Sequence, residues 1–266
     1  FGDKIAEIKL EGTISSSSGF LPVAQANPEK INRLLEKAES DPTVKAVLLN
    51  INSPGGSPVA SDEIASKVKS MNKTVVAYIG DVGASGAYWI ASSSDKIVAH
   101  PLSITCSIGA FTTTTDLSEF FSKIGFNYTT IKSGELKDIG SPFRPLTEKE
   151  KELLQNIINK IQNKFLLQIK ENRHLSDYQI SKILDGRPCL GEEALDYGLI
   201  DKAGTKEDAI NLIEEIANIK RPTVVTFEEK AYLLGSAFGA GLSKAFYALG
   251  FGIGESLKEP ASKIVS

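Results

Sequence analysis

The chain has 266 residues and a formal net charge of −3, with 41% hydrophobic and 24% charged residues. These values are ordinary for a soluble globular protein with a sizeable core, and they exclude the strongly basic surface of a nucleic-acid-binding protein. The two cysteines, Cys106 and Cys189, are too few for a disulfide framework or a metal cluster, so we expect buried free thiols and no metal.

The first hundred residues alternate between strand and helix patterns. Residues 4–10 alternate polar and apolar side chains, which predicts a half-exposed strand. Three apolar runs predict buried strands, at 44–51, 74–80 and 96–99. Two amphipathic patterns between the strands predict helices that begin at Pro28 and Pro58. This order is typical of right-handed βαβ units, so we expect an α/β fold with a mostly parallel sheet flanked by helices.

The second half of the chain contains the longest predicted helix. A shorter helix is predicted at 117–124 and a strand at 128–131. Thr147 and Glu150 then form a capping box for a long helix that ends near Arg173. An apolar stripe runs along this helix, formed by Leu153, Leu154, Ile157, Ile158 and Ile161. Further helices after Ser176, from Gly191 and at 205–219, with a strand at 223–227, complete a catalytic domain that we place at 1–227.

The segment at 231–254 is apolar and rich in glycine, and it is long enough to span a bilayer. However, Lys244 lies within it, and a charge at the centre of a spanning helix costs about 2.5–3.5 kcal/mol. We therefore assign 228–266 to a C-terminal tail that lies at a membrane interface or packs on a neighbouring subunit, in preference to a spanning helix.

The stretch Gly83-Ala84-Ser85-Gly86-Ala87 follows the predicted strand at 74–80. A turn of small residues between a strand and a helix lifts a serine hydroxyl to the end of a sheet, so Ser85 is the candidate nucleophile. A second small-residue turn contains Gly55 and Gly56. The N–H group of either glycine, with that of Gly86, would form an oxyanion hole. The alternative for both stretches is a close-packed turn without a catalytic role.

A serine hydroxyl at its free pKa needs an adjacent base. His174 is predicted to be a solvated helix end, whereas His100 ends a strand soon after the nucleophile turn and is one candidate. The other is a lysine, which must be held neutral by burial. Lys137 lies in a turn-rich loop, where composition alone predicts an exposed side chain.

Together these motifs resemble the signal peptide peptidase A family, serine proteases of the ClpP/crotonase fold with its repeated ββα and βαβ units. The matching segments follow one another in order, at 52–56, 83–88, 107–109, 133–144 and 185–201. The resemblance implies that Ser85 is the nucleophile, Lys137 its general base and Ser107 the hydroxyl that orients the lysine. It also implies a ring-like homo-oligomer in which the lysine can reach the serine of a neighbouring protomer. The chain departs from the family at Cys106, where a glycine is usual.

The resemblance implies a membrane-associated, ATP-independent serine endopeptidase that needs no cofactor. Its substrates would be cleaved signal peptides and other small or unfolded peptides, and its catalytic domain would lie outside the cytoplasm at the cell membrane. The family's membrane anchor precedes the catalytic domain, and no segment here matches it. Three alternatives stay open: a crotonase-type acyl-CoA enzyme that uses the glycine N–H groups to hold an enolate, a ClpP-like protease with His100 as base, and a membrane-associated ring without turnover.

Overall fold

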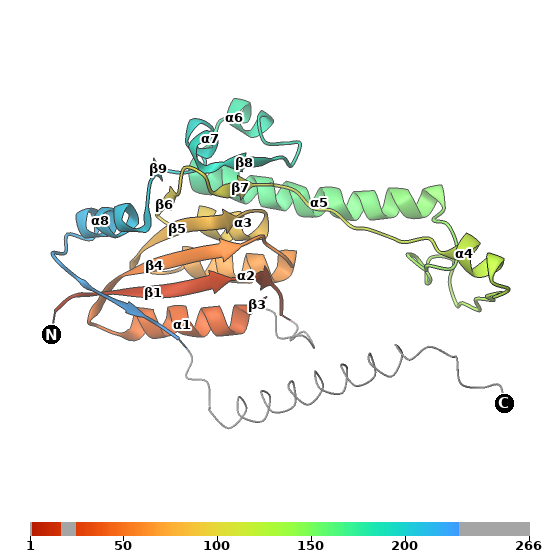
Figure 1. Ribbon diagram of the computed structural model, residues 1–266, viewed down its shortest axis with the longest axis horizontal. Helices are drawn as coiled ribbons and strands as arrows, with labels where there is room; N and C mark the ends of the chain where they lie inside the picture. The colour runs from red at the N-terminus through yellow and green to blue at the C-terminus, as the bar shows by residue number, and fades with distance from the viewer. Residues whose placement is uncertain (1, 17–24, 229–266) are drawn as a thin grey trace, which may run out of the picture. The chain divides into compact units, whose positions relative to one another are not determined.

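A parallel sheet, with the strand order β10-β1-β4-β5-β6-β9, forms the centre of the fold (Figure 1). The structure, a computed structural model, describes residues 2–16 and 25–228. The strands are β1 (Lys4–Glu11), β4 (Val44–Ser53), β5 (Thr74–Gly83), β6 (Lys96–Ala99), β9 (Lys202–Ala203) and β10 (Thr223–Thr226). Every neighbouring pair in this order is parallel, so the α/β fold with a mostly parallel sheet is confirmed.

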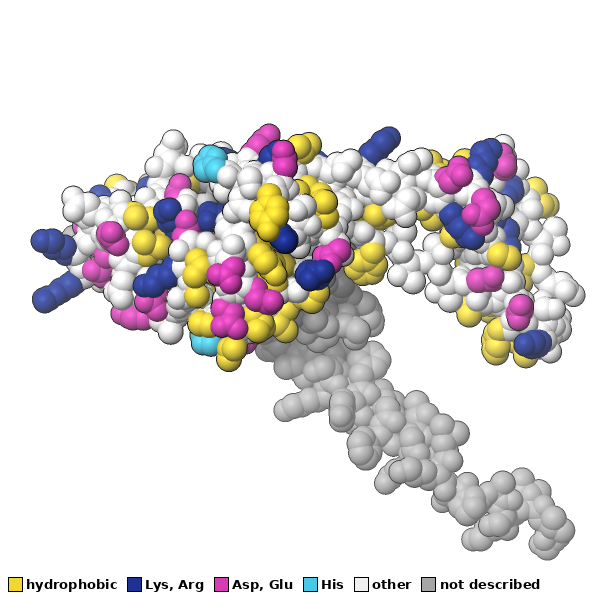
Figure 2. Space-filling model, turned by 90° about the horizontal axis from the view of Figure 1, so that it is seen from above, with side chains coloured by type: hydrophobic (Ala, Val, Ile, Leu, Met, Phe, Trp, Pro, Cys, Tyr) yellow, Lys and Arg dark blue, Asp and Glu magenta, His cyan; other side chains and the backbone are white. Residues whose placement is uncertain are grey.

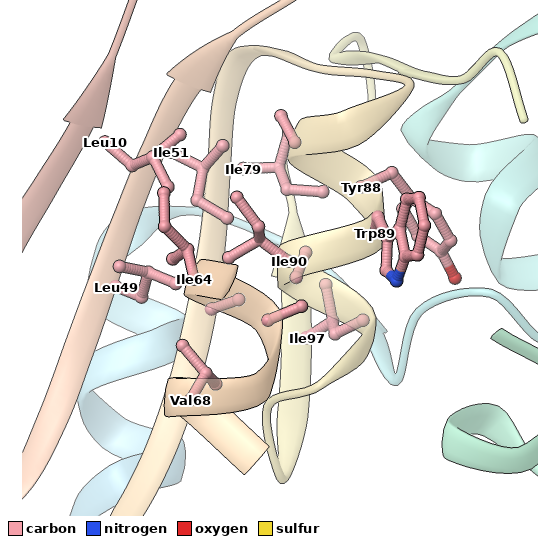
Figure 3. Close-up of a cluster of buried hydrophobic side chains, with 14 of the residues drawn as sticks. Leu10, Leu49, Ile51, Ile64, Val68, Ile79, Tyr88, Trp89, Ile90 and Ile97 are labelled. Atoms are coloured by element: carbon pink, nitrogen blue, oxygen red, sulfur yellow. The ribbon is translucent and has the colours of Figure 1, made fainter. Parts of the chain in front are cut away.

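Successive side chains of a strand point to opposite faces of the sheet. Apolar side chains lie on both faces here, and helices cover both. Leu49 and Ile51 of β4 face α2 and α3 (Figure 3), whereas Leu48 packs with Ile213 of α8. The helices are α1 (Pro28–Ser40), α2 (Pro58–Lys69), α3 (Gly86–Ser92), α4 (Ser118–Lys123), α5 (Glu148–Arg173), α6 (Asp177–Ser181), α7 (Gly191–Asp196) and α8 (Lys206–Ile216). In the described part of the chain, no helix combines the length and apolar character needed to cross a bilayer.

Two short strands lie beside the end of β5. β7 (Ile104–Cys106) pairs with β5 at one position and with β8 (Pro188–Leu190) in antiparallel register. This pairing brings Cys106 and Cys189, 83 residues apart in sequence, to a Cα–Cα distance of 5.5 Å, and they form a disulfide. The prediction of free thiols is therefore wrong, because sequence spacing does not reveal which strands pair. A separate two-stranded sheet contains β2 (Thr13–Ile14) and β3 (Gln25–Ala26).

Two predictions about strands also fail. β1 is buried from Ile5 to Ile8, not half-exposed, because it lies between β10 and β4. Its Glu7 suggested a solvated position, but the carboxylate is buried and accepts hydrogen bonds from Lys206 and Asn50. Residues 128–131 form no strand, since no strand in the described ranges lies beside them to supply hydrogen bonds. The predicted tail lies outside the described residues, apart from its first residue.

Helix α5 is packed along only part of its length. It begins as predicted, with Thr147 and Glu150 satisfying each other's backbone N–H groups. Its C-terminal half packs on α3, where Phe165 stacks on Trp89 with ring centroids 4.5 Å apart. Along its N-terminal half the apolar stripe is partly uncovered, and Ile157 is 46% exposed. A single chain therefore leaves an apolar surface on α5.

Candidate active site

Ser85 lies in the turn between β5 and α3, in a backbone conformation that few side-chain-bearing residues adopt. Its φ is 54° and its ψ is −126°. Such a conformation costs on the order of 1–3 kcal/mol and persists only where neighbouring contacts fix it. The Ser85 N–H donates to the carbonyl oxygen of Cys106 (2.9 Å), and the Ser85 carbonyl accepts the N–H of Trp89 (3.0 Å). Within the described residues, the Ser85 hydroxyl has no hydrogen-bond partner of its own.

Three glycines converge on this turn. Gly55, with a φ of 97°, lies so close that an added Cβ would be 2.9 Å from the Cβ of Ser85 and 2.7 Å from the nitrogen of Gly86. The Gly55 N–H donates to the hydroxyl of Ser53 at 3.1 Å. By contrast, the N–H groups of Gly56 and Gly86 have no acceptor in the described ranges. The geometry therefore favours Gly56 and Gly86, not Gly55, as the predicted oxyanion donors.

Ser85 and Ser107 line the same cavity, which has a volume of about 670 Å³. The two turn glycines, Gly55 and Gly56, form another part of its wall. Ser107 has a φ of 50°, and its N–H donates to the carbonyl of Arg187 at 2.9 Å. The structure thus brings together the predicted nucleophile, the predicted lysine-orienting hydroxyl and the predicted oxyanion glycines. Their chemical roles stay predictions.

A smaller, apolar pocket of about 120 Å³ adjoins Ser85. Its apolar side chains come from α2, α3, α5 and the segment after Ser107, namely Pro58, Trp89, Phe111, Ile158, Ile161 and Phe165. The Trp89 indole N–H donates to the side-chain oxygen of Gln168, which fixes the ring. Sequence reasoning missed these residues as parts of a site. The predicted apolar stripe contained Ile158 and Ile161 but not Phe165, and its spacing did not show that this helix face meets the nucleophile turn.

The structure does not bring Lys137 to Ser85 within one chain. Lys137 is exposed, in a turn at 134–140 that ion pairs tie to Glu150 in the first turn of α5. Ser85 lies near the other half of the helix, where α3 packs on Phe165. The 15 residues from Glu150 to Phe165 span roughly 22 Å at 1.5 Å per residue. Figure 1 shows the same separation, with the α4 segment beyond the N-terminal end of α5.

Arg144 connects the Lys137 turn to α5. Its guanidinium pairs with both Asp138 and Glu150, and Lys132 forms a further pair with Asp138. Hydrogen bonds from Arg144 stabilise the charged carboxylates, which lowers the pKa of Glu150 to about 2 and holds the pKa of Asp138 well below its usual range. This network therefore stays ionised at neutral pH and fixes the turn that carries Lys137.

His100, the alternative base, directly follows β6 and does not reach the end of the sheet where the nucleophile turn lies. Ile79 of β5 pairs with Ala99 of β6, so His100 lies one residue past this level, whereas Ser85 lies six residues past it. The Nδ1 of His100 accepts the N–H of Leu102 at 3.2 Å. His100 is not among the residues that line the cavity at Ser85. The arrangement gives no support to a ClpP-like role for His100.

The sequence model of peptidase family S49 matches residues 67–220 of the chain. MJ0651 of Methanocaldococcus jannaschii, a candidate protease, is 41% identical over 96% of this chain and 83% of its own length. The chain belongs to peptidase family S49. Other S49-like relatives are Protease 4 of Haemophilus influenzae, 36% identical over 84% of this chain, and the chloroplastic serine protease SPPA of Arabidopsis thaliana, 34% identical over 85%. This S49 chain spans 36% and 34% of the length of those two proteins.

Two solved structures of the 1510-N membrane-bound stomatin-specific protease share the fold of this S49 chain. A serine-to-alanine mutant superposes with a TM-score of 0.58 at 14% identity, covering 86% of this chain and 100% of that one. A lysine-to-alanine mutant in complex with a substrate peptide has a TM-score of 0.56 at 18% identity, covering 86% and 94%. At these identities the likeness shows the fold alone. Family membership and the names of the closer sequence relatives support serine protease activity.

Proposed function

We propose that this S49 chain is an ATP-independent serine endopeptidase whose site combines Ser85 of one protomer with Lys137 of a neighbouring protomer. The observation that carries the proposal is the backbone of Ser85. A non-glycine residue in a left-handed conformation, at the end of a strand and in the wall of a cavity, is typical of a nucleophile held for reaction. The separation of Lys137 from Ser85 along α5 supports a dyad formed between chains.

The proposed reaction proceeds through an acyl-enzyme. The Ser85 hydroxyl attacks the scissile carbonyl while neutral Lys137 accepts its proton. The N–H groups of Gly56 and Gly86 stabilise the tetrahedral oxyanion. The Lys137 ammonium, oriented by the Ser107 hydroxyl, then protonates the leaving amine. A water molecule repeats the sequence on the acyl-enzyme and restores Ser85.

The shape of the site favours peptides with an apolar residue before the cleaved bond. The apolar pocket beside Ser85 is small, about 120 Å³, and its walls are aliphatic and aromatic. A further groove runs from Ala110 and Phe111 along α5 to Leu154. We therefore propose cleaved signal peptides and other small or unfolded peptides as substrates, because their apolar segments fit such a surface.

We also propose that the chain works as a ring-like homo-oligomer at the cell membrane, with its catalytic domain outside the cytoplasm. Figure 2 shows hydrophobic side chains at the surface of the α4 end, at the right. They include Phe120 (58% exposed), Phe126 (59%) and Ile131 (96%). An exposed apolar surface of this kind is typical of an interface. The proposed location follows from the resemblance to the signal peptide peptidase A family.

Labelling with a serine-directed phosphonate tests the proposed chemistry. We expect one label per chain, on Ser85, and its loss in Ser85→Ala and in Lys137→Ala. Lys170→Ala removes a lysine of α5 that pairs with Asp177, and it should label like the wild type. Labelling and turnover should rise from acidic to alkaline pH with the fraction of neutral lysine. Labelling that survives Ser85→Ala would overturn the proposal, and an enzyme that turns over acyl-CoA without labelling would favour the crotonase alternative.

A further inference from the structure

The Cys106–Cys189 disulfide lies directly behind the predicted nucleophile. The carbonyl of Cys106 accepts the Ser85 N–H at 2.9 Å, and the next residue, Ser107, lines the same cavity as Ser85. Both cysteines are buried, with exposed fractions of 1% and 6%. One covalent bond is therefore connected, through a single hydrogen bond, to the backbone of the residue that attacks the substrate.

The strands joined by this disulfide are otherwise held by hydrogen bonds. The Thr105 hydroxyl donates to the carbonyl of Gly83 at 2.8 Å, and the Ser107 N–H donates to the carbonyl of Arg187 at 2.9 Å. β7 and β8 contain three residues each. β7 pairs with the main sheet at one position only, between Val82 and Ile104. Two short paired strands are marginally stable without further support. The disulfide adds a covalent link to these hydrogen bonds, at the position whose carbonyl contacts Ser85.

The backbone around the disulfide is also conformationally demanding. Ser85, Cys106 and Ser107 have φ values of 54°, 62° and 50°, all in the left-handed region that side-chain-bearing residues seldom adopt. Such residues keep this conformation only where their surroundings fix it. A shift of β7 after cleavage would move the Cys106 carbonyl relative to the Ser85 N–H that it accepts, and Ser107 could then leave its positive-φ conformation.

We propose that the disulfide is a positioning element of the active site, which holds the Cys106 carbonyl against Ser85 and keeps Ser107 in the cavity. Its cleavage then slows acylation of Ser85 without weakening peptide binding. This inference rests on the proposed function, in which Ser85 is the nucleophile. Cleavage by a dithiol is balanced: the dithiol closes to a cyclic disulfide, and its two electrons and two protons convert the Cys106–Cys189 bond into two thiols.

The test compares three forms of the full chain: oxidised, reduced with dithiothreitol, and the double variant Cys106→Ser with Cys189→Ser. Phosphonate labelling is followed in time, so that its amplitude reports the competent fraction and its rate reports the positioning of Ser85. We expect the rate to fall about 10- to 100-fold in the reduced and double-variant forms. The KM for a peptide should stay unchanged while kcat falls, and dithiothreitol should not affect the double variant.

Hydrogen exchange of the segment 83–87 provides a readout that does not depend on catalysis. The Ser85 amide should exchange faster once the disulfide is cleaved, because its acceptor is no longer held. An unchanged labelling rate in protein with two titratable thiols would overturn the inference. So would a lower amplitude at an unchanged rate, which would mean that the disulfide only stabilises the fold. If the oxidised chain is not labelled at Ser85, the proposed function fails, and the exchange of the Ser85 amide still decides the positioning role.

Discussion

At the scale of single residues, the site depends on how closely backbone groups approach Ser85. A side chain at position 55 would have no room beside Ser85. The N–H of Ser85 donates to the carbonyl of Cys106. Sequence motifs predicted Ser85 and the glycines as site residues, because a run of small residues after a strand can be recognised from the sequence alone. The sequence did not show that the Gly55 N–H donates to the Ser53 hydroxyl, because this hydrogen bond depends on side-chain geometry inside the turn.

The first residue-scale prediction concerns Gly55→Ala. An added Cβ would lie 2.7 Å from the nitrogen of Gly86 in a backbone with a φ of 97°, so the turn must shift. We expect phosphonate labelling of Ser85 to fall at least about 100-fold. Gly2→Ala is the control, because an added Cβ there meets nothing within 4 Å. Equal labelling rates in the two variants would show that the Gly55 turn does not shape the site.

The second residue-scale prediction concerns substrate choice. Ile161 lines the apolar pocket beside Ser85, whereas Ile157, one turn away on α5, does not. Ile161→Ala should enlarge the pocket and shift the preferred residue before the cleaved bond towards larger apolar side chains, by about 10- to 200-fold in relative kcat/KM. A peptide library that varies this position measures the shift. The idea fails if Ile157→Ala changes the preference as much as Ile161→Ala does.

At the scale of elements, α5 connects the parts of the site. Its capping box and its apolar spacing were predictable from sequence, because both are local patterns. Its uncovered N-terminal half was not, since the same apolar stripe would look identical in a fully buried helix. The pairing of β7 with β8 could not be predicted from the sequence either, and neither could the disulfide that joins them. Local periodicity shows which elements form, whereas their partners depend on contacts between distant residues.

An element-scale prediction concerns acid stability. Because Arg144 lowers the pKa of Glu150 to about 2, the pair stabilises the folded chain above the ordinary carboxyl pKa. That stabilisation is lost as the pH falls towards 2. Arg144→Gln should therefore lower the melting temperature more at pH 7 than at pH 2, measured by circular dichroism. Lys151→Gln, which removes only an exposed pair, should show no such pH dependence. A pH-independent effect of Arg144→Gln would contradict this account of the network.

At the scale of the whole molecule, a single chain keeps the predicted lysine apart from the predicted nucleophile and exposes apolar side chains. Ser85, Ser107, Gly55 and Gly56 line one cavity, but Lys137 is exposed and distant from it. The residues at 128–131 form no strand with any described part of the chain, and Ile131 is 96% exposed. The sequence could suggest a shared dyad only through resemblance to a family. The exposure of Lys137 in a single chain adds a physical reason to propose a shared dyad, because a lysine base must be buried to be neutral.

Complementation between two inactive variants tests the shared dyad most directly. Ser85→Ala and Lys137→Ala chains, each inactive alone, are coexpressed with different tags, and the doubly tagged assemblies are purified. A dyad formed between protomers predicts that these mixed assemblies regain phosphonate labelling, confined to the Ser85 of the Lys137→Ala chains. Mixed assemblies that contain both variants and show no labelling or peptide cleavage would contradict it.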